Sequence, residues 1–355
     1  MALQISTTFE RDWDEPDDPT PVQMAVVGLG WFGADVAIPA IAESEYCTLG
    51  AVVSGSAEKA ERIGDEWGAT PLTYDEYHDG VGRDAYDAVY VVTPNALHLP
   101  YVETAAEYDK PILCEKPLEA TAERTEELVA ACESAEVPLM TAYRMQTTRS
   151  VRWVRSLVRD GVIGDPVHVN GEFSFRILAD GGDPDQWRLD ADLAGGGALM
   201  DIGVYPMNTS RFVLGADPTA VAGAWYATRG PFEGVDEHVS FQLEYPGAVS
   251  ASCSASFGAW SASRFAVLGT DGRIVIEDPF GVDADRRLTV DVGGHETTLA
   301  VDEPNEMVEE FDFFASRLLR DEPIGPDARH GLFDVKIAEA VYESGNTGRQ
   351  ISLQD

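Results

Sequence analysis

The sequence predicts an α/β protein with a doubly wound parallel sheet in its first half and an α+β half with a large open, mostly antiparallel sheet. Short apolar runs alternate with helical patterns from Val22 to about Arg144, and a G-x-G-x-x-G motif follows the first of these runs. Strand-like segments with little helix between them fill much of the second half. Alternation of strand and helix favours a parallel sheet, and consecutive strands favour an antiparallel one. We therefore expect an acidic N-terminal arm at 1–21, one domain at 22–144 and another at 145–355.

The parallel strands are expected in five apolar segments, at residues 22–30, 48–56, 85–94, 110–117 and 137–143. Helical patterns separate them, most clearly at residues 56–68 and 121–136. In the second half, a helix is expected at residues 149–164. Strands are then expected at residues 167–177, 239–245, 248–257 and 264–278, before two terminal helices at 306–321 and 330–344.

The composition is strongly acidic, with 62 Asp and Glu against 25 Lys and Arg and a formal net charge of -37. Such a charge repels nucleic-acid phosphates and anionic lipid head groups, so neither nucleic acid nor membrane is an expected partner. The acidic residues are spread along apolar-periodic segments, which indicates a folded protein with an acidic surface. Because molar salt shortens the screening length to about 3 Å, we predict a halophilic protein.

The cysteines and histidines argue against a disulfide-bonded protein and against a metal-binding one. The four cysteines form no C-x-x-C pair, which indicates buried thiols in a reducing compartment. The six histidines lack metal-binding spacing, so no metal site is expected. Residues 1–21 contain no apolar signal or membrane-spanning segment, which favours the cytoplasm and a mobile arm or one that docks on a neighbour.

A glycine motif follows the first strand. Gly28, Gly30 and Gly33 enclose Trp31 and Phe32 in G-x-G-x-x-G, with an apolar strand before it and a helical pattern after it. Glycines allow a tight turn and close approach of a pyrophosphate, and the helix N-terminus supplies amide donors. The motif predicts a dinucleotide-binding Rossmann domain; the alternative is a glycine-rich turn that holds no ligand.

The end of the second strand indicates which dinucleotide is bound. A site that prefers NAD usually places an acidic residue there, but this chain has Ser54, Gly55, Ser56 and then Lys59. Hydroxyl groups and an ammonium suit a 2′-phosphate, and Lys59 is one of only four lysines. We predict NADP; the alternative is a solvated lysine on the first turn of a helix.

Polar residues follow the next strand as well. Thr93, Pro94, Asn95 and His98 come directly after an apolar run, at the edge of a parallel sheet where ligands bind. We expect these four residues to line the nicotinamide side of the site. Alternatively, the tripeptide is a turn and His98 lies on a helix face.

Glu115 and Lys116 end the following strand in the same way. A lysine there can donate a hydrogen bond to a substrate oxygen, and Glu115 can accept one from a ribose hydroxyl. A surface ion pair at a strand end is the structural alternative.

Three glycines precede an acid and a tyrosine in "LAGGGALMDIGVYPMN", residues 193–208. If a helix begins near Ala198, Asp201 and Tyr205 lie on one face, four residues apart. An acid beside a tyrosine, together with a lysine, is a set that lets a phenol act as a base. Pro206 could alter this spacing, and a capping Asp201 with a packed Tyr205 is the alternative.

These motifs together resemble the glucose-fructose oxidoreductase, inositol dehydrogenase and MocA family. The resemblance extends from Val22 to the C-terminus and is carried by E-K-P at 115–117, "GGGALMD" at 195–201 and "TPN" with His98. It implies that Lys116 is the catalytic lysine before a cis proline, and that Asp201 and Tyr205 contact the sugar, with Tyr205 accepting the proton. The positions implied to lie near the cofactor include Ser54, Gly55, Lys59, Tyr143, Arg144, Trp187 and Arg188.

The family's tyrosine-containing branch implies NADP-dependent oxidation of an aldose, D-xylose first, at C1. Two related activities remain open, a trans-dihydrodiol dehydrogenase and a sugar-sugar oxidoreductase, and so does a non-catalytic NADP sensor. An open sheet has one face for a partner, so a homodimer or homotetramer is expected.

Overall fold

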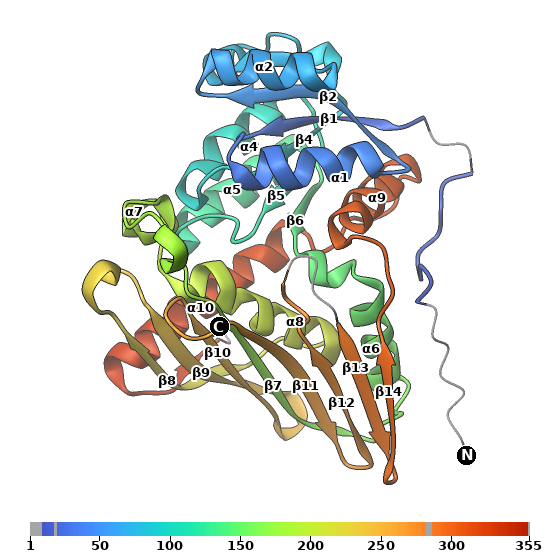
Figure 1. Ribbon diagram of the computed structural model, residues 1–355, viewed down its shortest axis with the longest axis vertical. Coiled ribbons are helices and arrows are strands. Elements are labelled where there is room, and N and C mark those ends of the chain that lie inside the picture. Colours follow the sequence, from blue (N-terminus) through green and yellow to red (C-terminus); the bar gives the residue numbers. More distant parts are fainter. Residues whose placement is uncertain (1–8, 18–19, 282–285, 354–355) are drawn as a thin grey trace. The chain divides into compact units, whose positions relative to one another are not determined.

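The computed structural model describes residues 9–17, 20–281 and 286–353 (Figure 1). The chain forms two compact units. The parallel-sheet unit contains residues 13–147 and 304–335, and the mixed-sheet unit contains residues 148–303, residues 336 onward and the chain before Trp13.

The parallel-sheet unit contains the predicted doubly wound sheet, in the order β3-β2-β1-β4-β5-β6 with every neighbouring pair parallel. Its strands are β1 Val22–Val27, β2 Cys47–Ser54, β3 Thr70–Thr73, β4 Ala88–Val91, β5 Ile112–Glu115 and β6 Leu139–Ala142. Its longer helices are α1 Ile38–Glu43, α2 Ala57–Trp67, α3 Tyr74–His78, α4 His98–Glu107, α5 Ala122–Ala135 and α9 Glu306–Leu319. Short helices cover η1 Phe32–Ala37, η2 Arg83–Ala85, η3 Asn95–Leu97 and η4 Arg144–Gln146. The central strands β1 and β4 are apolar and almost completely buried, as expected for a sheet covered on both faces.

Helix α9 belongs to the parallel-sheet unit, although it lies far along the chain. The Asp312 carboxylate accepts hydrogen bonds from the Ser44 hydroxyl at 2.5 Å and the Glu45 amide at 2.9 Å. Glu306 forms a buried ion pair with Arg144. These units therefore differ from the expected ranges 22–144 and 145–355, because side-chain contacts distant in sequence return residues 304–335 to the first unit.

The mixed-sheet unit contains nine strands, in the order β14-β13-β12-β11-β7-β10-β9-β8-β15. Neighbours are antiparallel except β7 and β10, which confirms the predicted mostly antiparallel sheet. The first five strands are β7 Pro166–Ser174, β8 Ala220–Ala227, β9 His238–Tyr245, β10 Val249–Ser256 and β11 Ala262–Gly269. The others are β12 Gly272–Glu277, β13 Arg287–Val292, β14 His295–Ala300 and β15 Ile351–Ser352.

Helices pack on one face of this sheet. Those that contact it directly are η7 Leu199–Gly203 and α8 Val204–Leu214. The unit also contains α6 Arg149–Arg159, α7 Ala191–Ala194 and α10 Ala328–Thr347, which enters it at Lys336. The remaining short turns are η5 Ala179–Gly181, η6 Trp187–Leu189, η8 Gly230–Phe232 and η9 Pro246–Ala248. Helix α8 contacts β7 and β10 and lies beside α6 (Figure 1). In β9, Val239, Phe241 and Leu243 point to this covered face, while Ser240 and Gln242 between them are exposed.

The described part of the N-terminal arm packs against its own chain rather than extending as a mobile segment. Phe9 is 3% exposed and packs edge-on against Trp153 in α6, with the ring centroids 5.5 Å apart. Asp12 pairs with Arg152 of the same helix. Trp13 is buried in the other unit against Phe313, with centroids 5.9 Å apart. Two aromatic residues within an acidic segment explain this packing.

Within the ranges the structure describes, no helix combines the length and the apolar character needed to cross a bilayer.

Candidate functional site

The glycine loop joins β1 to a π-helical turn, η1, that continues into α1. Gly28 has φ of +108°, and a Cβ there would lie 2.7 Å from the Val92 carbonyl oxygen. A Cβ on Gly33 would lie 2.1 Å from the Gly28 carbonyl oxygen. Gly30 differs, since a Cβ there would meet no atom within 4 Å among the described residues. The backbone is therefore open to a ligand at Gly30, and the other two glycines fix the turn.

Trp31 and Phe32, which the sequence also assigns to cofactor binding, differ in exposure. The Trp31 side chain is 66% exposed, whereas Phe32 is half-buried against the core. Their rings meet edge-on with centroids 6.1 Å apart.

The second strand ends in the hydroxyl groups that the NADP prediction requires. Ser54 is 6% exposed, and its hydroxyl accepts a hydrogen bond from the Ser56 amide at 3.2 Å. Ser56 caps α2 by accepting from the Lys59 amide at 3.3 Å. Gly55 lies against the Tyr74 ring, where a Cβ would come within 3.1 Å. Lys59 therefore lies on the first turn of a helix whose N-terminus follows the Ser54–Ser56 turn.

Thr93 and His98 occupy different environments at the end of β4. The Thr93 hydroxyl is buried and has no hydrogen-bond partner in the part of the chain that the structure describes. An unsatisfied buried hydroxyl is costly unless a water or a ligand pairs with it. Asn95 is also buried, at 4% exposed, and Pro94 between them is half-buried.

His98, which we expect on the nicotinamide side of the site, has a fully buried side chain. Its Nε2 lies 2.8 Å from the Thr93 carbonyl oxygen, and its Nδ1 lies 3.0 Å from the Leu118 carbonyl oxygen. Burial lowers the pKa of the imidazole, while the two carbonyl groups oppose that shift. His98 thus links the loop after β4 to the loop after β5. Sequence alone could not distinguish a lining histidine from one beneath the surface.

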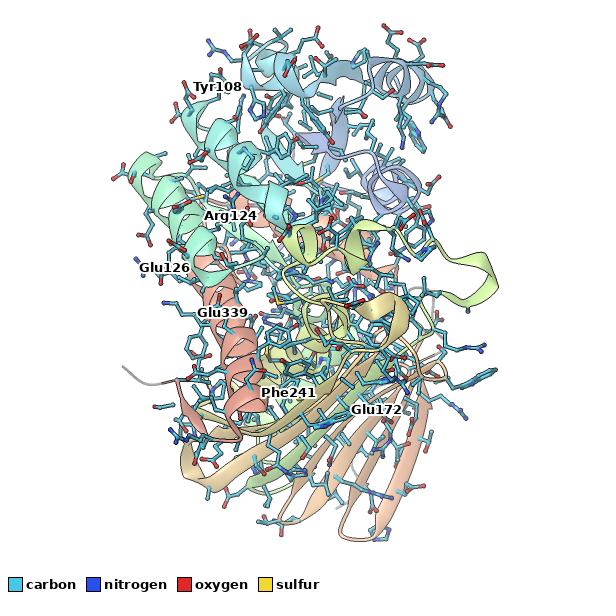
Figure 2. The ribbon with its side chains drawn as sticks, turned by 90° about the vertical axis from the view of Figure 1, so that its left-hand side faces the viewer. Tyr108, Arg124, Glu126, Glu172, Phe241 and Glu339 are labelled. Atoms are coloured by element: carbon cyan, nitrogen blue, oxygen red, sulfur yellow. The ribbon has the colours of Figure 1, made fainter. Side chains whose placement is uncertain are left out.

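The loop after β5 carries Glu115 and Lys116. Glu115 accepts a hydrogen bond from the Tyr90 hydroxyl at 2.6 Å and another from the Lys116 amide at 3.2 Å. The Lys116–Pro117 peptide bond is cis, as the family resemblance implies. Glu119 is completely buried and accepts from the Arg124 guanidinium at 3.0 Å and 3.1 Å. Arg124 lies near the start of α5 (Figure 2). These contacts hold the loop on both sides of Lys116.

Arg144, which the family resemblance implies to lie near the cofactor, belongs to a buried acidic cluster. It is 4% exposed and pairs with Glu306 of α9. Glu310, one turn further along α9, is fully buried, and neither of its carboxylate oxygens has a hydrogen-bond partner among the described residues. Burial, aided by the negative charge of Glu115, raises the pKa of Glu310 well above its usual range. No local pattern indicates this cluster, because its members are distant in sequence and belong to ordinary helical patterns.

In the mixed-sheet unit, Asp201 lies in η7 and Tyr205 in the first turn of α8. The Arg188 Nε donates to the Asp201 carboxylate at 3.2 Å, and the Arg188 guanidinium lies 4.6 Å from the Trp187 ring centroid. Sequence reasoning assigned Arg188 and Trp187 to the cofactor and missed this pairing with Asp201. The Tyr205 ring packs edge-on against Phe173, with centroids 5.6 Å apart. Asp201 and Tyr205 are both half-buried, so each retains some accessible surface.

Pro206 follows a π-helical turn rather than breaking the helix. The proline lacks the N–H that a regular α-helix needs, and a π turn is a common accommodation of such an irregularity. Position 171 of β7 must be glycine, because a Cβ there would lie 2.5 Å from the Pro206 Cβ.

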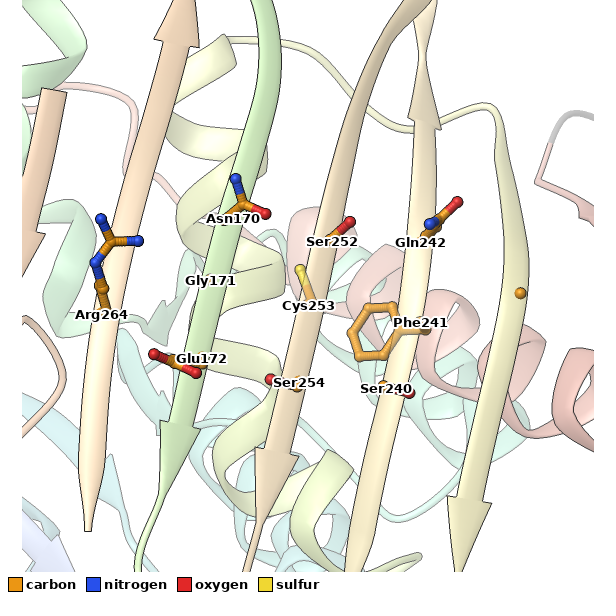
Figure 3. A pocket seen from close by; sticks show the side chains of 11 residues that line it. Asn170, Gly171, Glu172, Ser240, Phe241, Gln242, Ser252, Cys253, Ser254 and Arg264 are labelled. Atoms are coloured by element: carbon orange, nitrogen blue, oxygen red, sulfur yellow. The ribbon is translucent and has the colours of Figure 1, made fainter. Parts of the chain in front are cut away.

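The exposed face of the mixed sheet is hollowed where β7, β9, β10 and β11 lie side by side (Figure 3). The hollow has a volume of about 410 Å³. Polar side chains dominate its lining, among them Asn170, Glu172, Ser240, Gln242, Ser252, Ser254 and Arg264. In β8, Trp225 pairs in register with Ser240 and is 58% exposed.

The two units therefore offer different chemistry. In the parallel-sheet unit, three features suit a dinucleotide that carries a 2′-phosphate: the open backbone at Gly30, the Thr93 hydroxyl with no partner among the described residues, and the start of α2 near Lys59. The mixed-sheet unit supplies a carboxylate held by an arginine, and a tyrosine. No cluster of three or more metal-ligating side chains occurs among residues 9–17, 20–281 and 286–353.

Both halves of the chain match models of known oxidoreductase domains. Residues 22–143 match the model of the oxidoreductase family with an NAD-binding Rossmann fold, and residues 151–275 match the GFO/IDH/MocA C-terminal domain. The chain is 46% identical to the D-xylose 1-dehydrogenase [NADP(+)] of Haloarcula marismortui, over 97% of this chain and 96% of that protein. It is 33% identical to the D-xylose 1-dehydrogenase (NADP(+)) 2 of Haloferax volcanii, over 94% of this chain and 100% of that protein.

A solved structure shows the same likeness. The aldose-aldose oxidoreductase of Caulobacter crescentus, crystallised with glycerol, superposes with a TM-score of 0.88 at 32% identity. The match covers 94% of this chain and 99% of the Caulobacter chain.

Proposed function

Because the chain belongs to the GFO/IDH/MocA family of oxidoreductases, we propose that it is an NADP-dependent D-xylose 1-dehydrogenase. It oxidises the C1 hydroxyl of D-xylopyranose to the lactone, in the catabolism of pentoses. The observation that carries this conclusion is the 46% identity, over nearly the full length, to a D-xylose 1-dehydrogenase of a haloarchaeon. Lys116, Asp201 and Tyr205, the residues that the family resemblance makes catalytic, are all present.

The parallel-sheet unit holds the cofactor, NADP. Bound NADP+ supplies a nicotinamide C4 that accepts hydride. The backbone at Gly30 would hold the pyrophosphate, and the hydroxyls of Ser54 and Ser56 with the Lys59 ammonium would hold the 2′-phosphate. Thr93, whose buried hydroxyl has no partner among the described residues, pairs with a polar group of the nicotinamide nucleotide.

Side chains of the protein bind the sugar and accept the proton of its C1 hydroxyl. Tyr205 takes the proton from the C1 hydroxyl as hydride leaves C1, so the sugar loses two electrons and two hydrogens in one step. Lys116 donates a hydrogen bond to the sugar oxygen and Asp201, held by Arg188, orients a second hydroxyl. These three roles rest on the family resemblance.

The test is an initial-rate assay at 340 nm in molar KCl, with NADP or NAD and with D-xylose or D-glucose. We expect rapid reduction of NADP by D-xylose. Tyr205→Phe and Lys116→Ala should each lower kcat by about 100-fold or more, because general base catalysis and substrate orientation are lost. Tyr226→Phe is the matched control, since the Tyr226 hydroxyl bonds to Asn346 at 2.5 Å within the mixed-sheet unit. Near wild-type turnover in a folded Tyr205→Phe enzyme would refute the assignment.

A sugar-sugar oxidoreductase is the second candidate, favoured by the likeness to the Caulobacter aldose-aldose oxidoreductase. Such an enzyme reduces one sugar with the hydride taken from another, so NADPH does not accumulate when two sugars are supplied. Product analysis by mass spectrometry separates the two activities, because only the sugar-sugar enzyme forms a sugar alcohol from the second sugar. A dihydrodiol substrate in the same assay tests the remaining enzymatic alternative. An NADP sensor would bind the dinucleotide and turn over none of these substrates.

We also propose that the hollowed face of the mixed sheet binds a second copy of the chain, giving a homodimer or a homotetramer built from two such dimers. Support comes from the opposite charges of Glu172 and Arg264 on one face, which a twofold axis can pair between copies, and from exposed Trp225. Gln242→Arg, in the middle of this face, should lower the mass measured by light scattering, whereas Glu126→Arg on α5 should not. An unchanged oligomer in both variants would argue against this face.

A reducing compartment, the cytoplasm, is proposed from the cysteines. Cys47, Cys114, Cys132 and Cys253 are all free and buried, and burial raises the pKa of each thiol. Finding the protein outside the cytoplasm in fractionated cells would contradict this.

A further inference from the structure

The helical segment that carries Asp201 and Tyr205 begins on a carboxylate supplied from far along the chain. Asp236 precedes β9 and is 2% exposed. Its Oδ1 accepts from the Gly197 amide at 2.7 Å, and its Oδ2 accepts from the Leu199 amide at 2.8 Å. Its backbone carbonyl accepts from the Ala198 amide at 2.8 Å. One residue thus satisfies three successive amides at a helix start, where amides otherwise lack partners.

The second and third glycines before this helix are required by the same contacts. A Cβ on Gly197 would lie 2.1 Å from the Asp236 carbonyl oxygen, and a Cβ on Gly196 would lie 2.1 Å from the Tyr342 hydroxyl oxygen. Within the mixed-sheet unit, Asp236 and Tyr342 therefore fill the space beside Gly196 and Gly197.

Tyr342, on α10, completes the arrangement. Its hydroxyl donates to the Asp236 Oδ1 at 2.5 Å. Burial raises the pKa of both groups, and the negative charge of Asp236 raises that of Tyr342 further, so the phenol remains a donor. The carboxylate therefore receives three hydrogen bonds in a nearly dry environment, where each is strong.

These contacts lie one turn from Asp201. The Asp201 amide donates to the Gly197 carbonyl at 3.1 Å, so a shift of residues 197–199 is transmitted directly to Asp201. Tyr205 follows one turn later in the same continuous helix. A displacement of about 1 Å at a reacting group can cost about 100-fold in rate.

We propose that Asp236 and Tyr342 form a clamp whose role is to position Asp201 and Tyr205 for the reaction. They are positioning residues, since they act through the helix start at residues 197–199. This proposal rests on the proposed function, because it assumes that Asp201 and Tyr205 act on the sugar.

Two substitutions test the clamp. Asp236→Asn keeps the shape but leaves one amide or the Tyr342 hydroxyl facing an amide nitrogen, and should lower kcat/KM for D-xylose by about 30-fold. Tyr342→Phe removes one donor and should lower it by about fivefold. The double variant should lose less than the product of the two effects, because both act on one network.

The controls separate positioning from general destabilisation. Tyr226→Phe removes a hydroxyl that donates to Asn346 of α10. The Tyr226 ring packs against the Tyr342 ring, with centroids 5.6 Å apart, and this variant should retain full activity. The Kd for NADPH, followed by its fluorescence, should be unchanged in all variants, because the proposed NADP contacts at Gly30, Ser54 and Lys59 belong to the parallel-sheet unit. Kinetics are measured well below the melting temperature of each variant.

Amide hydrogen exchange of the protein without substrate gives a readout independent of turnover. In Asp236→Asn, the Gly197 and Leu199 amides should exchange at least about tenfold faster than in the wild type. If those amides exchange faster but no sugar is oxidised by the wild type, the clamp contacts stand and the proposed function fails. If the wild type oxidises D-xylose and Asp236→Asn keeps kcat/KM within twofold, the clamp proposal is overturned.

Discussion

At the residue scale, the choice between NADP and NAD depends on the first turn of α2. Lys59 follows the Ser54–Ser56 turn, whereas Arg62 lies one turn further and pairs with Glu66 at 3.7 Å on the exposed surface. We predict that Lys59→Ala raises KM for NADP by about tenfold, because one charged contact to the 2′-phosphate is lost. KM for NAD, which lacks that phosphate, should stay the same. Arg62→Ala is the control, because it removes one positive charge as well. An equal rise of KM for NADP in both variants would indicate that net charge, and not a contact of Lys59 with the phosphate, sets the affinity.

At the scale of elements, α9 is fixed to the parallel-sheet unit by carboxyl groups. Glu306 pairs with Arg144, and Asp312 accepts from the loop before β2. Removing one partner of a buried ion pair leaves an uncompensated charge, at a cost of about 3–5 kcal/mol. The position of α9 therefore depends on polar contacts as well as on the apolar packing of Phe311 and Phe314 in the same core.

Glu310, on the same helix, makes the stability depend on pH. Its pKa is raised above the ordinary value of 4.5, so the folded chain holds a proton that the unfolded chain releases. Stability should therefore fall as pH rises from about 4.5 toward the raised pKa, by up to about 1.4 kcal/mol per pH unit for this group. Burial is the main cause of the raised pKa of Glu310; the negative charges of Glu115 and Glu306 add to it, and the positive charge of Arg144 opposes it.

Glu310→Gln cannot ionise, and we predict that it flattens this decline and stabilises the protein at alkaline pH. Urea unfolding at several pH values between 5 and 8.5, at fixed KCl, measures the slope. Glu123→Gln, an exposed position on α5, is the control. Identical slopes for wild type and Glu310→Gln would show that the carboxyl is ionised in the folded state.

For the whole molecule, the net charge of -37 sets the response to salt. Repulsion among surface carboxylates opposes the compact state and is screened by molar salt. We predict that the urea midpoint rises steadily between 0.2 M and 2 M KCl. Sucrose at matched osmotic strength is the control, because it is excluded from the protein surface but does not screen charge. It should raise the urea midpoint less than KCl does. A midpoint independent of KCl would contradict a halophilic protein.

Strongly patterned elements were predictable at every scale. The apolar strands β1, β4 and β5 and the helices α5 and α9 follow from period and length. The chain at β3 and β14 gave little signal, because β3 is short and contains Pro71, and β14 is an edge strand with five of its six residues exposed. An exposed edge needs no apolar face, so its pattern resembles that of a loop.

The sequence by itself determined the family, the two sheet types and the motifs that carry chemistry, because these depend on local periodicity and on glycine, proline and charged residues at short spacing. Only the tertiary structure decided the surroundings of those residues. In the folded chain, His98 is buried between two carbonyl groups. Arg144 pairs with Glu306, and Arg188 pairs with Asp201. Asp236 and Tyr342 fill the space beside Gly196 and Gly197. Arg144 and Glu306 are 162 positions apart and Asp236 and Tyr342 are 106 apart, so no local pattern indicates either partner. The physical reason is that burial and hydrogen bonding depend on which distant segments the packing of a core brings together.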